Sequence, residues 1–238
     1  MDTALTVRFS DLNIGMESRY DFLRAFCRDY VTDAPPCFTV RADQTAVSRQ
    51  IAQAEEPVTP EYAEALQLYR EIAERLPLYD RAVFHGAAIE YGGKAYLFTG
   101  ASGVGKSTHI RLWRRYLGQR VHIINGDKPI LRADASGVTV YGTPYAGKEG
   151  WQRSVSAPLG GICFLSQSAE NAVTALPPER AFTRLYQQIY KPKTAAAAAK
   201  TVELLRALSA VPCCELSCDK SQDAVKASFA ALTGEDLT

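Results

Sequence analysis

Alternating apolar and polar positions mark the beginning of the chain. In the stretch LTVRF at residues 5–9 every second side chain is apolar, which predicts a strand with one buried face. Residues 19–30 (RYDFLRAFCRDY) place apolar side chains at helical spacing, and a short strand at 38–40 leads into a second helical stretch. We expect residues 1–52 to fold as a small α/β unit.

A polar, proline-containing stretch at residues 53–61 (QAEEPVTPE) separates this unit from the rest. Within it, Thr59-Pro60-Glu61 is a typical helix start, because proline suits the first helical position and an acid suits the first turn. The sequence predicts a helix over about residues 60–76. We place the domain boundary here, with an N-terminal α/β appendage at residues 1–58 and a larger domain at residues 59–238.

Strand-like and helical patterns alternate through the larger domain. Residues 82–99 form two strand-like runs around Tyr91-Gly92-Gly93-Lys94, where the glycine pair suits a tight hairpin turn. Apolar residues at three- and four-residue spacing predict a helix over 107–117, and a strand follows at 121–124. The later pattern predicts a hairpin at 129–141, glycine-rich connections at 142–150 and 158–161, and a buried strand at 162–165. It then predicts helices at 178–190 and 194–211 and a short strand at 214–216 before a terminal helix. This mixture predicts the α/β class.

Composition narrows the functional classes. Of the 238 residues 47% are hydrophobic and 22% charged, which is typical of a globular protein and not of a disordered one. The net charge of +1 gives no general electrostatic footprint for nucleic acid. The start, MDTALTVRFSDLN, lacks the apolar core of a secretory signal, and no apolar stretch is long enough to span a bilayer. We therefore expect a cytoplasmic protein with neither nucleic acid nor membrane as partner.

A glycine-rich stretch between a predicted strand and a predicted helix matches the phosphate-binding pattern GxxxxGK[ST]. Its glycines let successive backbone N–H groups face phosphate oxygens, and the helix N-terminus adds its positive dipole end. In this pattern Lys106 reaches the β- and γ-phosphates, while the Ser107 hydroxyl ligates Mg²⁺. The motif predicts a nucleotide and Mg²⁺ as ligands, bound by Gly100, Ala101, Ser102, Gly103, Val104, Gly105, Lys106, Ser107 and Thr108.

Phosphoryl chemistry also needs a carboxylate that holds the metal, usually at the end of an apolar strand. The run VHIINGD supplies this pattern, because Asp127 follows Lys106 by 21 residues, about enough for one helix and one strand. Two interpretations stay open: Asp127 ligates the metal together with Ser107, or it only caps the polar turn Asn-Gly-Asp.

The run from His85 to Asp127 resembles the HPr serine kinase/phosphorylase family, which is related in fold to the nucleotide-dependent phosphoenolpyruvate carboxykinases. The resemblance is carried by His85-Gly86, Gly100–Thr108 and Asp127, more weakly by GTPYAGKEG and PLGGICFL, and it covers roughly residues 60–190. It implies a P-loop nucleotide-binding core with a mixed β-sheet, and transfer of the γ-phosphoryl group of ATP to a serine hydroxyl. The family spacing between His and P-loop Lys implies that His85 lies near the metal and phosphates. Without the resemblance, a lone histidine on an alternating strand is more often a core residue.

Two departures from the family qualify the mechanism. The family usually carries two adjacent acids where this chain has Gly126-Asp127. Either Asp127 acts mainly as base with a water-mediated metal contact, or His85 or Asn125 helps to position the attacking hydroxyl. The segment that accompanies dephosphorylation in the bifunctional enzymes has no counterpart, which predicts a kinase-only relative whose substrate is not implied to be HPr.

Three functional hypotheses follow. The first is an ATP-dependent serine kinase with Asp127, Lys106 and His85 as catalytic residues and a protein, peptide or small hydroxyl compound as acceptor. The second is a P-loop NTPase or small-molecule kinase of another class. The third is a nucleotide-binding regulatory or scaffold protein with weak or no turnover. Because members of the family are commonly oligomeric, a homo-oligomer is possible.

Overall fold

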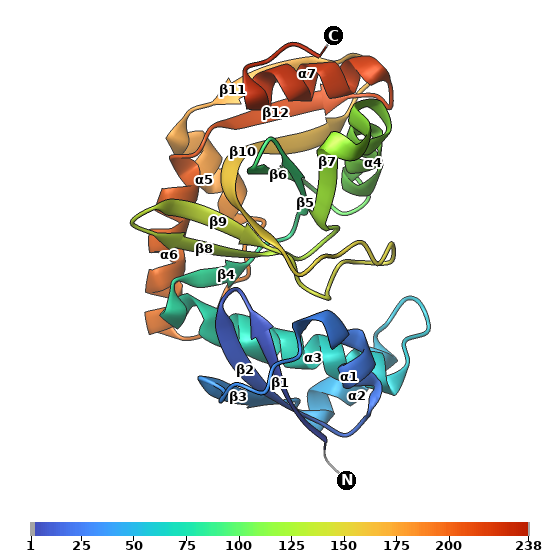
Figure 1. Ribbon diagram of the computed structural model, residues 1–238, viewed down its shortest axis with the longest axis vertical. Coiled ribbons are helices and arrows are strands. Elements are labelled where there is room, and N and C mark those ends of the chain that lie inside the picture. The colour runs from blue at the N-terminus through green and yellow to red at the C-terminus, as the bar shows by residue number, and fades with distance from the viewer. Residues whose placement is uncertain (1–2, 238) are drawn as a thin grey trace.

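A small sheet and a large sheet organise the computed structural model, which describes residues 3–237 (Figure 1). In the small sheet β1 (Thr3–Phe9) pairs antiparallel with β2 (Leu12–Ser18), and β2 pairs parallel with β3 (Phe38–Arg41). Strand β2 was not predicted. It forms a tight hairpin with β1 through Ser10 and Asp11, whose φ angles of 47° and 64° are those of a two-residue primed turn.

Three helices accompany the small sheet: α1 (Phe22–Phe26), α2 (Gln44–Ala52) and α3 (Pro60–Arg75). The predicted helix start is confirmed, because the Thr59 hydroxyl accepts a hydrogen bond from the Tyr62 backbone N–H at 3.4 Å. The apolar face of α3 shares one hydrophobic cluster with β1 and β2. That cluster therefore runs across the predicted boundary between residues 58 and 59, and we call β1–β3 with α1–α3 the N-terminal layer.

The large sheet is mixed, with strand order β4-β8-β9-β10-β6-β5-β7, and β12 and β11 continue it beyond the second half of β10. Strand β10 runs parallel to β6 and β12, whereas β5 runs antiparallel to both β6 and β7. The predicted α/β class is confirmed. The strands are β4 (Arg81–Val83), β5 (Ala87–Tyr91), β6 (Lys94–Thr99), β7 (Val121–Asn125), β8 (Ile130–Asp134), β9 (Gly137–Tyr141), β10 (Ser156–Gln167), β11 (Ala172–Leu176) and β12 (Cys213–Cys218).

Four helices cover the two faces of this sheet (Figure 1). Helices α4 (Lys106–Leu117) and α7 (Gln222–Thr233) pack on one face, and α5 (Pro178–Tyr186) and α6 (Ala195–Ser209) on the other. Successive residues of β5 and β6 point to opposite faces, so that each face has its own hydrophobic cluster. The sheet is thus buried on both sides, and its strand ends are where chemistry can be exposed.

Two expectations about strands need correction. Residues 82–91 do not form one strand: β4 pairs with β8 and β5 with β6 and β7, and His85 lies in the bend between them. Residues 158–161 are not a connection but part of β10, with a register shift between Leu159 and Gly161. A side chain at Gly161 would lie 2.8 Å from Leu232, so close packing of α7 explains this glycine without a turn.

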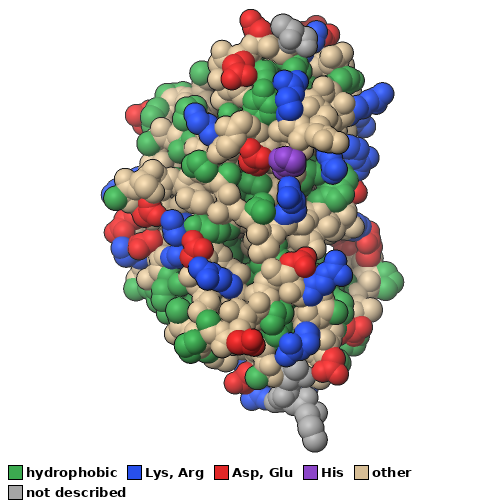
Figure 2. Space-filling model, viewed as in Figure 1, with side chains coloured by type: hydrophobic (Ala, Val, Ile, Leu, Met, Phe, Trp, Pro, Cys, Tyr) green, Lys and Arg blue, Asp and Glu red, His purple; other side chains and the backbone are tan. Residues whose placement is uncertain are grey.

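The surface matches the balanced composition. Acidic and basic side chains are interspersed over the face shown in Figure 2. Within residues 3–237 no helix combines the length and hydropathy that a membrane crossing requires.

Candidate functional site

Strand directions bring the predicted site residues to one edge of the large sheet. Because β6 and β7 are both antiparallel to β5, their carboxyl ends lie at the edge where β5 begins. The glycine-rich loop 100–105 leaves β6 there, Asp127 follows β7, and His85 precedes β5. Three segments that are separate in sequence therefore meet at this edge.

The glycine-rich loop ends in a helix start without a side-chain cap. Gly105, with φ of 105°, precedes Lys106 as N-cap, and within the described residues no side chain caps this end. The N–H of His109 bonds to Gly105 O at 2.9 Å, so the N–H groups of the three residues before it lack a carbonyl within the helix. The Lys106 ammonium donates to Gly100 O at 3.3 Å and Ala101 O at 3.2 Å. This end can receive an anion.

Asn125, and not Asp127, makes the turn after β7. The buried Asn125 amide oxygen accepts hydrogen bonds from the backbone N–H groups of Asp127 at 2.8 Å and Lys128 at 2.7 Å. Its amide nitrogen donates to Thr143 O at 2.9 Å. Asn125 is thus a positioning residue for the turn, and the carboxylate of Asp127 can take other partners.

The Asp127 carboxylate lies between His85 and Lys128. Its Oδ1 is 3.5 Å from His85 Nε2, and its other oxygen pairs with the Lys128 ammonium. The backbone fixes this pair as well, because the Gly86 N–H donates to Asp127 O at 2.9 Å. Lys128 was missed from the sequence, although its place directly after Asp127 is a signal that could have been weighed.

Two further contacts hold His85 in its bend. The His85 backbone N–H donates to Gln188 O at 2.8 Å, and the Thr99 hydroxyl donates to His85 O at 2.7 Å. Burial lowers the pKa of His85, the charge of Lys106 lowers it further, and Asp127 opposes both. A lowered pKa keeps the imidazole neutral at pH 7. Gln188 is a site neighbour that no sequence signal indicated.

Lys106 belongs to the same electrostatic site. Burial lowers the pKa of its ammonium and the charge of Asp127 opposes this shift. The structure therefore brings Lys106, His85 and Asp127 into one another's electrostatic range. Ser107 follows in the first turn of α4.

The loop 142–150 closes over position 126, directly before Asp127. A Cβ on Gly126 would lie 2.6 Å from Ala146 O, and one on Gly147 would lie 3.2 Å from the Asp127 Cβ. A side chain at position 126 is therefore excluded unless the loop moves. The site has a single carboxylate at this turn because backbone occupies the space of a second one.

The N-terminal layer reaches the same turn. The Tyr69 hydroxyl donates to Lys128 O at 2.8 Å, and the charge of Asp127 adds to burial in raising the pKa of Tyr62. Both tyrosines are on α3. No residue of this helix was predicted to belong to the site, because a helical pattern does not tell which distant loop the helix will face.

A cavity of about 570 Å³ opens beside the glycine-rich loop. Its wall combines Gly100–Val104, Phe164–Gln167 at the end of β10, and Arg184 and Gln188 from the α5 side. The backbone oxygen of Gln188 accepts the hydrogen bond of the His85 backbone N–H at 2.8 Å, so this cavity borders the segment that holds His85. The volume lies within the range of small-molecule sites.

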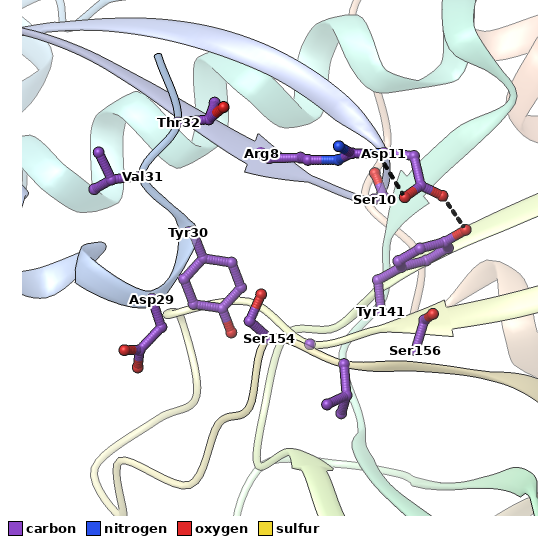
Figure 3. Close-up of a pocket in the computed structure, with 12 residues that line it drawn as sticks. Arg8, Ser10, Asp11, Asp29, Tyr30, Val31, Thr32, Tyr141, Ser154 and Ser156 are labelled. Atoms are coloured by element: carbon purple, nitrogen blue, oxygen red, sulfur yellow. Dashed lines mark hydrogen bonds and ion pairs between the residues drawn. The ribbon is translucent and has the colours of Figure 1, made fainter. Parts of the chain in front are cut away.

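A separate cavity of about 340 Å³ lies where the N-terminal layer meets β9 and β10 (Figure 3). Asp11 is its best-connected acid: it accepts a hydrogen bond from the Tyr141 hydroxyl at 2.7 Å and pairs with Arg8 at 3.6 Å. The predicted site residues are not among the described residues that line it. This cavity lies between the N-terminal layer and the large sheet, and the glycine-rich loop does not contribute to its described wall.

Comparison with known proteins gives a weak structural likeness. No protein-family model matches the chain, and no curated protein matches it. Among solved structures it is similar to the Hpr(Ser) kinase/phosphatase from Coxiella burnetii, with 10% identity and a TM-score of 0.35 over 64% of this chain and 93% of that one. This likeness is too low to carry an argument, so the functional conclusion has to come from the site.

Proposed function

We propose that the protein is a phosphotransferase that moves the γ-phosphoryl group of ATP to a serine-type hydroxyl of a protein, peptide or small molecule. The observation that carries the proposal is the His85–Asp127 pair, 3.5 Å apart, at the sheet edge where the glycine-rich loop and Lys106 also lie. Phosphoryl transfer depends mainly on positioning and charge stabilisation, and this edge offers both.

The residues present fit a nucleotide with its metal. The uncapped N-terminus of α4 supplies N–H donors for phosphate oxygens. Ser107 and Asp127 supply oxygen ligands, and Mg²⁺ usually needs only one or two protein ligands beside phosphates and water. When bound, Mg²⁺ neutralises charge on the β- and γ-phosphates.

Each residue then has a defined task. Lys106 exchanges its contacts with Gly100 O and Ala101 O for phosphate oxygens. The acceptor hydroxyl oxygen forms a bond to the γ-phosphorus, the bond to the bridging oxygen of ADP breaks, and the hydroxyl proton goes to the Asp127 carboxylate. Neutral His85 holds that carboxylate in place and lines the path of the transferred group.

One observation favours a second candidate, a nucleotide-binding regulatory or scaffold protein with weak or no turnover. Ala146 O occupies the space beside Gly126, so metal binding and proton acceptance cannot be divided between two adjacent acids. A carboxylate that ligates Mg²⁺ is a weakened base. Turnover decides between the two candidates.

The test is transfer from γ-labelled ATP to free serine and to seryl peptides in the wild type and in Lys106→Ala. The substitution removes the lysine contact to the phosphates, so we expect MgATP affinity or turnover to fall at least about tenfold, or about 1.4 kcal/mol. Lys94→Ala, an exposed lysine at the start of β6, is the matched control.

Unchanged affinity together with unchanged turnover in Lys106→Ala would contradict the proposal. Tight MgATP binding without ADP formation over hours, with every acceptor, would favour the regulatory candidate. ADP formation without labelled acceptor would indicate an NTPase.

A further inference from the structure

The glycine-rich loop has a second cavity on its other side. This cavity, of about 330 Å³, lies between α4 and the segment that connects β12 to α7. Val104, Leu112, Leu165 and Cys218 give it a largely apolar wall, and Thr108 and Asp219 add polar groups. The predicted site residues account for only part of this wall, and the phosphoryl-transfer chemistry above does not use the rest.

The order of strands tells which end of a nucleotide would lie here. Along the carboxyl edge the order is β7, β5, β6, β10 and β12, so His85 and Asp127 lie on one side of the loop that follows β6. Leu165 and Asp219, at the ends of β10 and β12, lie on the opposite side. A triphosphate whose γ end meets Asp127 must extend its nucleoside end toward β10 and β12.

We propose that this cavity binds the purine base of the nucleotide, an inference that rests on the proposed function. Its apolar walls suit the faces of a flat heteroaromatic ring, and Thr108 places the cavity directly after the phosphate-binding residues of α4. The larger cavity is the alternative for the base. Its wall includes Gln188, however, whose backbone oxygen accepts from the His85 N–H, and this assigns it to the phosphoryl end of the ligand.

Asp219 gives the cavity a means of recognising the ring edge. Its Oδ1 accepts hydrogen bonds from the Ser221 N–H at 2.9 Å, the Ser221 hydroxyl at 2.6 Å and the Asn171 amide at 3.0 Å, which fixes the carboxylate in place. Among residues 3–237 no group donates a hydrogen bond to its Oδ2. That oxygen can accept from the exocyclic amino group of a purine.

The test fills the cavity from a half-exposed helix position. Leu112→Trp places a large ring in it, and Arg115→Trp places the same ring on an exposed position of the same helix as a control. Calorimetry compares MgATP with magnesium tripolyphosphate, which occupies the loop but has no base. We expect Leu112→Trp to weaken MgATP binding at least about tenfold and to leave tripolyphosphate binding unchanged, with the control like wild type for both ligands.

Wild-type MgATP affinity in Leu112→Trp would overturn the inference while the phosphate site stands. Failure of the wild type to bind either ligand would instead overturn the proposed function, and the inference with it. The two failures are therefore distinguishable.

A second measurement needs no substitution. Cys218 lines the cavity and is partly exposed, whereas Cys37 is exposed elsewhere and serves as internal reference. At ten times its Kd, MgATP should slow alkylation of Cys218 about tenfold and leave Cys37 unchanged, and tripolyphosphate should protect neither. Equal Cys218 rates with and without saturating MgATP would overturn the inference even if Leu112→Trp failed to fold.

Discussion

His109 makes the stability of the protein depend on pH. The ring is buried in the contact between α4 and α7, where Nε2 lies 2.9 Å from the Ser228 hydroxyl oxygen. The Trp113 indole N–H donates to the same oxygen at 2.8 Å, and the Ser228 hydroxyl donates to Val225 O at 3.0 Å. Burial lowers the pKa of His109 from 6.5 to about 4. The folded protein therefore holds this histidine neutral where the unfolded chain would protonate it.

The sign and size of the effect follow from that difference. Between pH 6.5 and about 4 the unfolded chain binds more protons at this residue than the folded protein does, so the free energy of unfolding falls as the pH falls. The contribution is fully present above pH 6.5 and is lost on the way to pH 4. A difference of about 2.5 pKa units corresponds to about 3 kcal/mol, a large share of the stability of a domain.

The assay is urea unfolding of wild type and His109→Gln at several pH values from 7.5 to 4. Glutamine keeps an N–H donor for Ser228 but does not titrate, and all other titratable groups, His85 included, cancel in the difference between the two proteins. We expect the wild type to lose up to about 3 kcal/mol relative to the variant as the pH falls. If the difference in the free energy of unfolding between the two proteins stays constant over this range, the reasoning is refuted, because burial would then not lower the pKa of His109.

Two substitutions probe the acidic side of the site. Gly126→Asp should lower the free energy of unfolding by about 1–3 kcal/mol without raising the rate of phosphoryl transfer, because the new Cβ meets Ala146 O. Gly126→Ala should lower it by a similar amount, which would show that the contact and not the charge is responsible. Faster transfer with an unchanged melting temperature in Gly126→Asp would contradict this. His85→Ala should reduce the single-turnover transfer rate more than ADP affinity, since the contact matters where charge develops; a variant that is only less stable, with an unchanged rate per folded molecule, would remove His85 from the site.

Local signals in the sequence were sufficient for the elements around the loop. The Thr59 cap, the glycine pair at 92–93 and the amphipathic pattern of α4 each act within a few residues, and all three predictions are confirmed. Strand β2 and edge strand β11 were missed because their positions depend on partners. Residues 12–18 alternate weakly, and β11 exposes most of its residues and is defined by its pairing with β12.

The candidate site was predictable where chain order determines it. A strand, a glycine-rich loop, a helix and a second strand followed by Asp127 return the carboxylate to the loop when the two strands are parallel, and the structure places it there. Apart from its sequence neighbour Lys128, the environment of Asp127 was not predictable, because it comes from the loop 142–150 and from Tyr62. These contacts join elements whose mutual distance no local pattern encodes.

Two kinds of contact hold the loop 142–150 against Asp127, and their free-energy contributions differ in size. Lys148 pairs with Glu56 at 2.6 Å, but both side chains are largely exposed, and such surface pairs contribute about 0–1 kcal/mol. Tyr145, directly before Ala146, is buried, stacks on the Tyr69 ring at 3.8 Å and donates to Ala65 O at 2.9 Å. Burying such an aromatic side chain contributes several times more than the surface pair.

Packing against α3 therefore sets the position of Ala146, and Ala146 O in turn excludes a second acid at position 126. The N-terminal layer thus shapes the carboxylate side of the site through its packing with Tyr145 rather than through charge. Since Tyr69 also binds Lys128 O, one helix of that layer supports the turn of Asp127 from both the loop and the strand end. The site therefore has a single carboxylate because α3 of the N-terminal layer positions the loop that closes over Gly126.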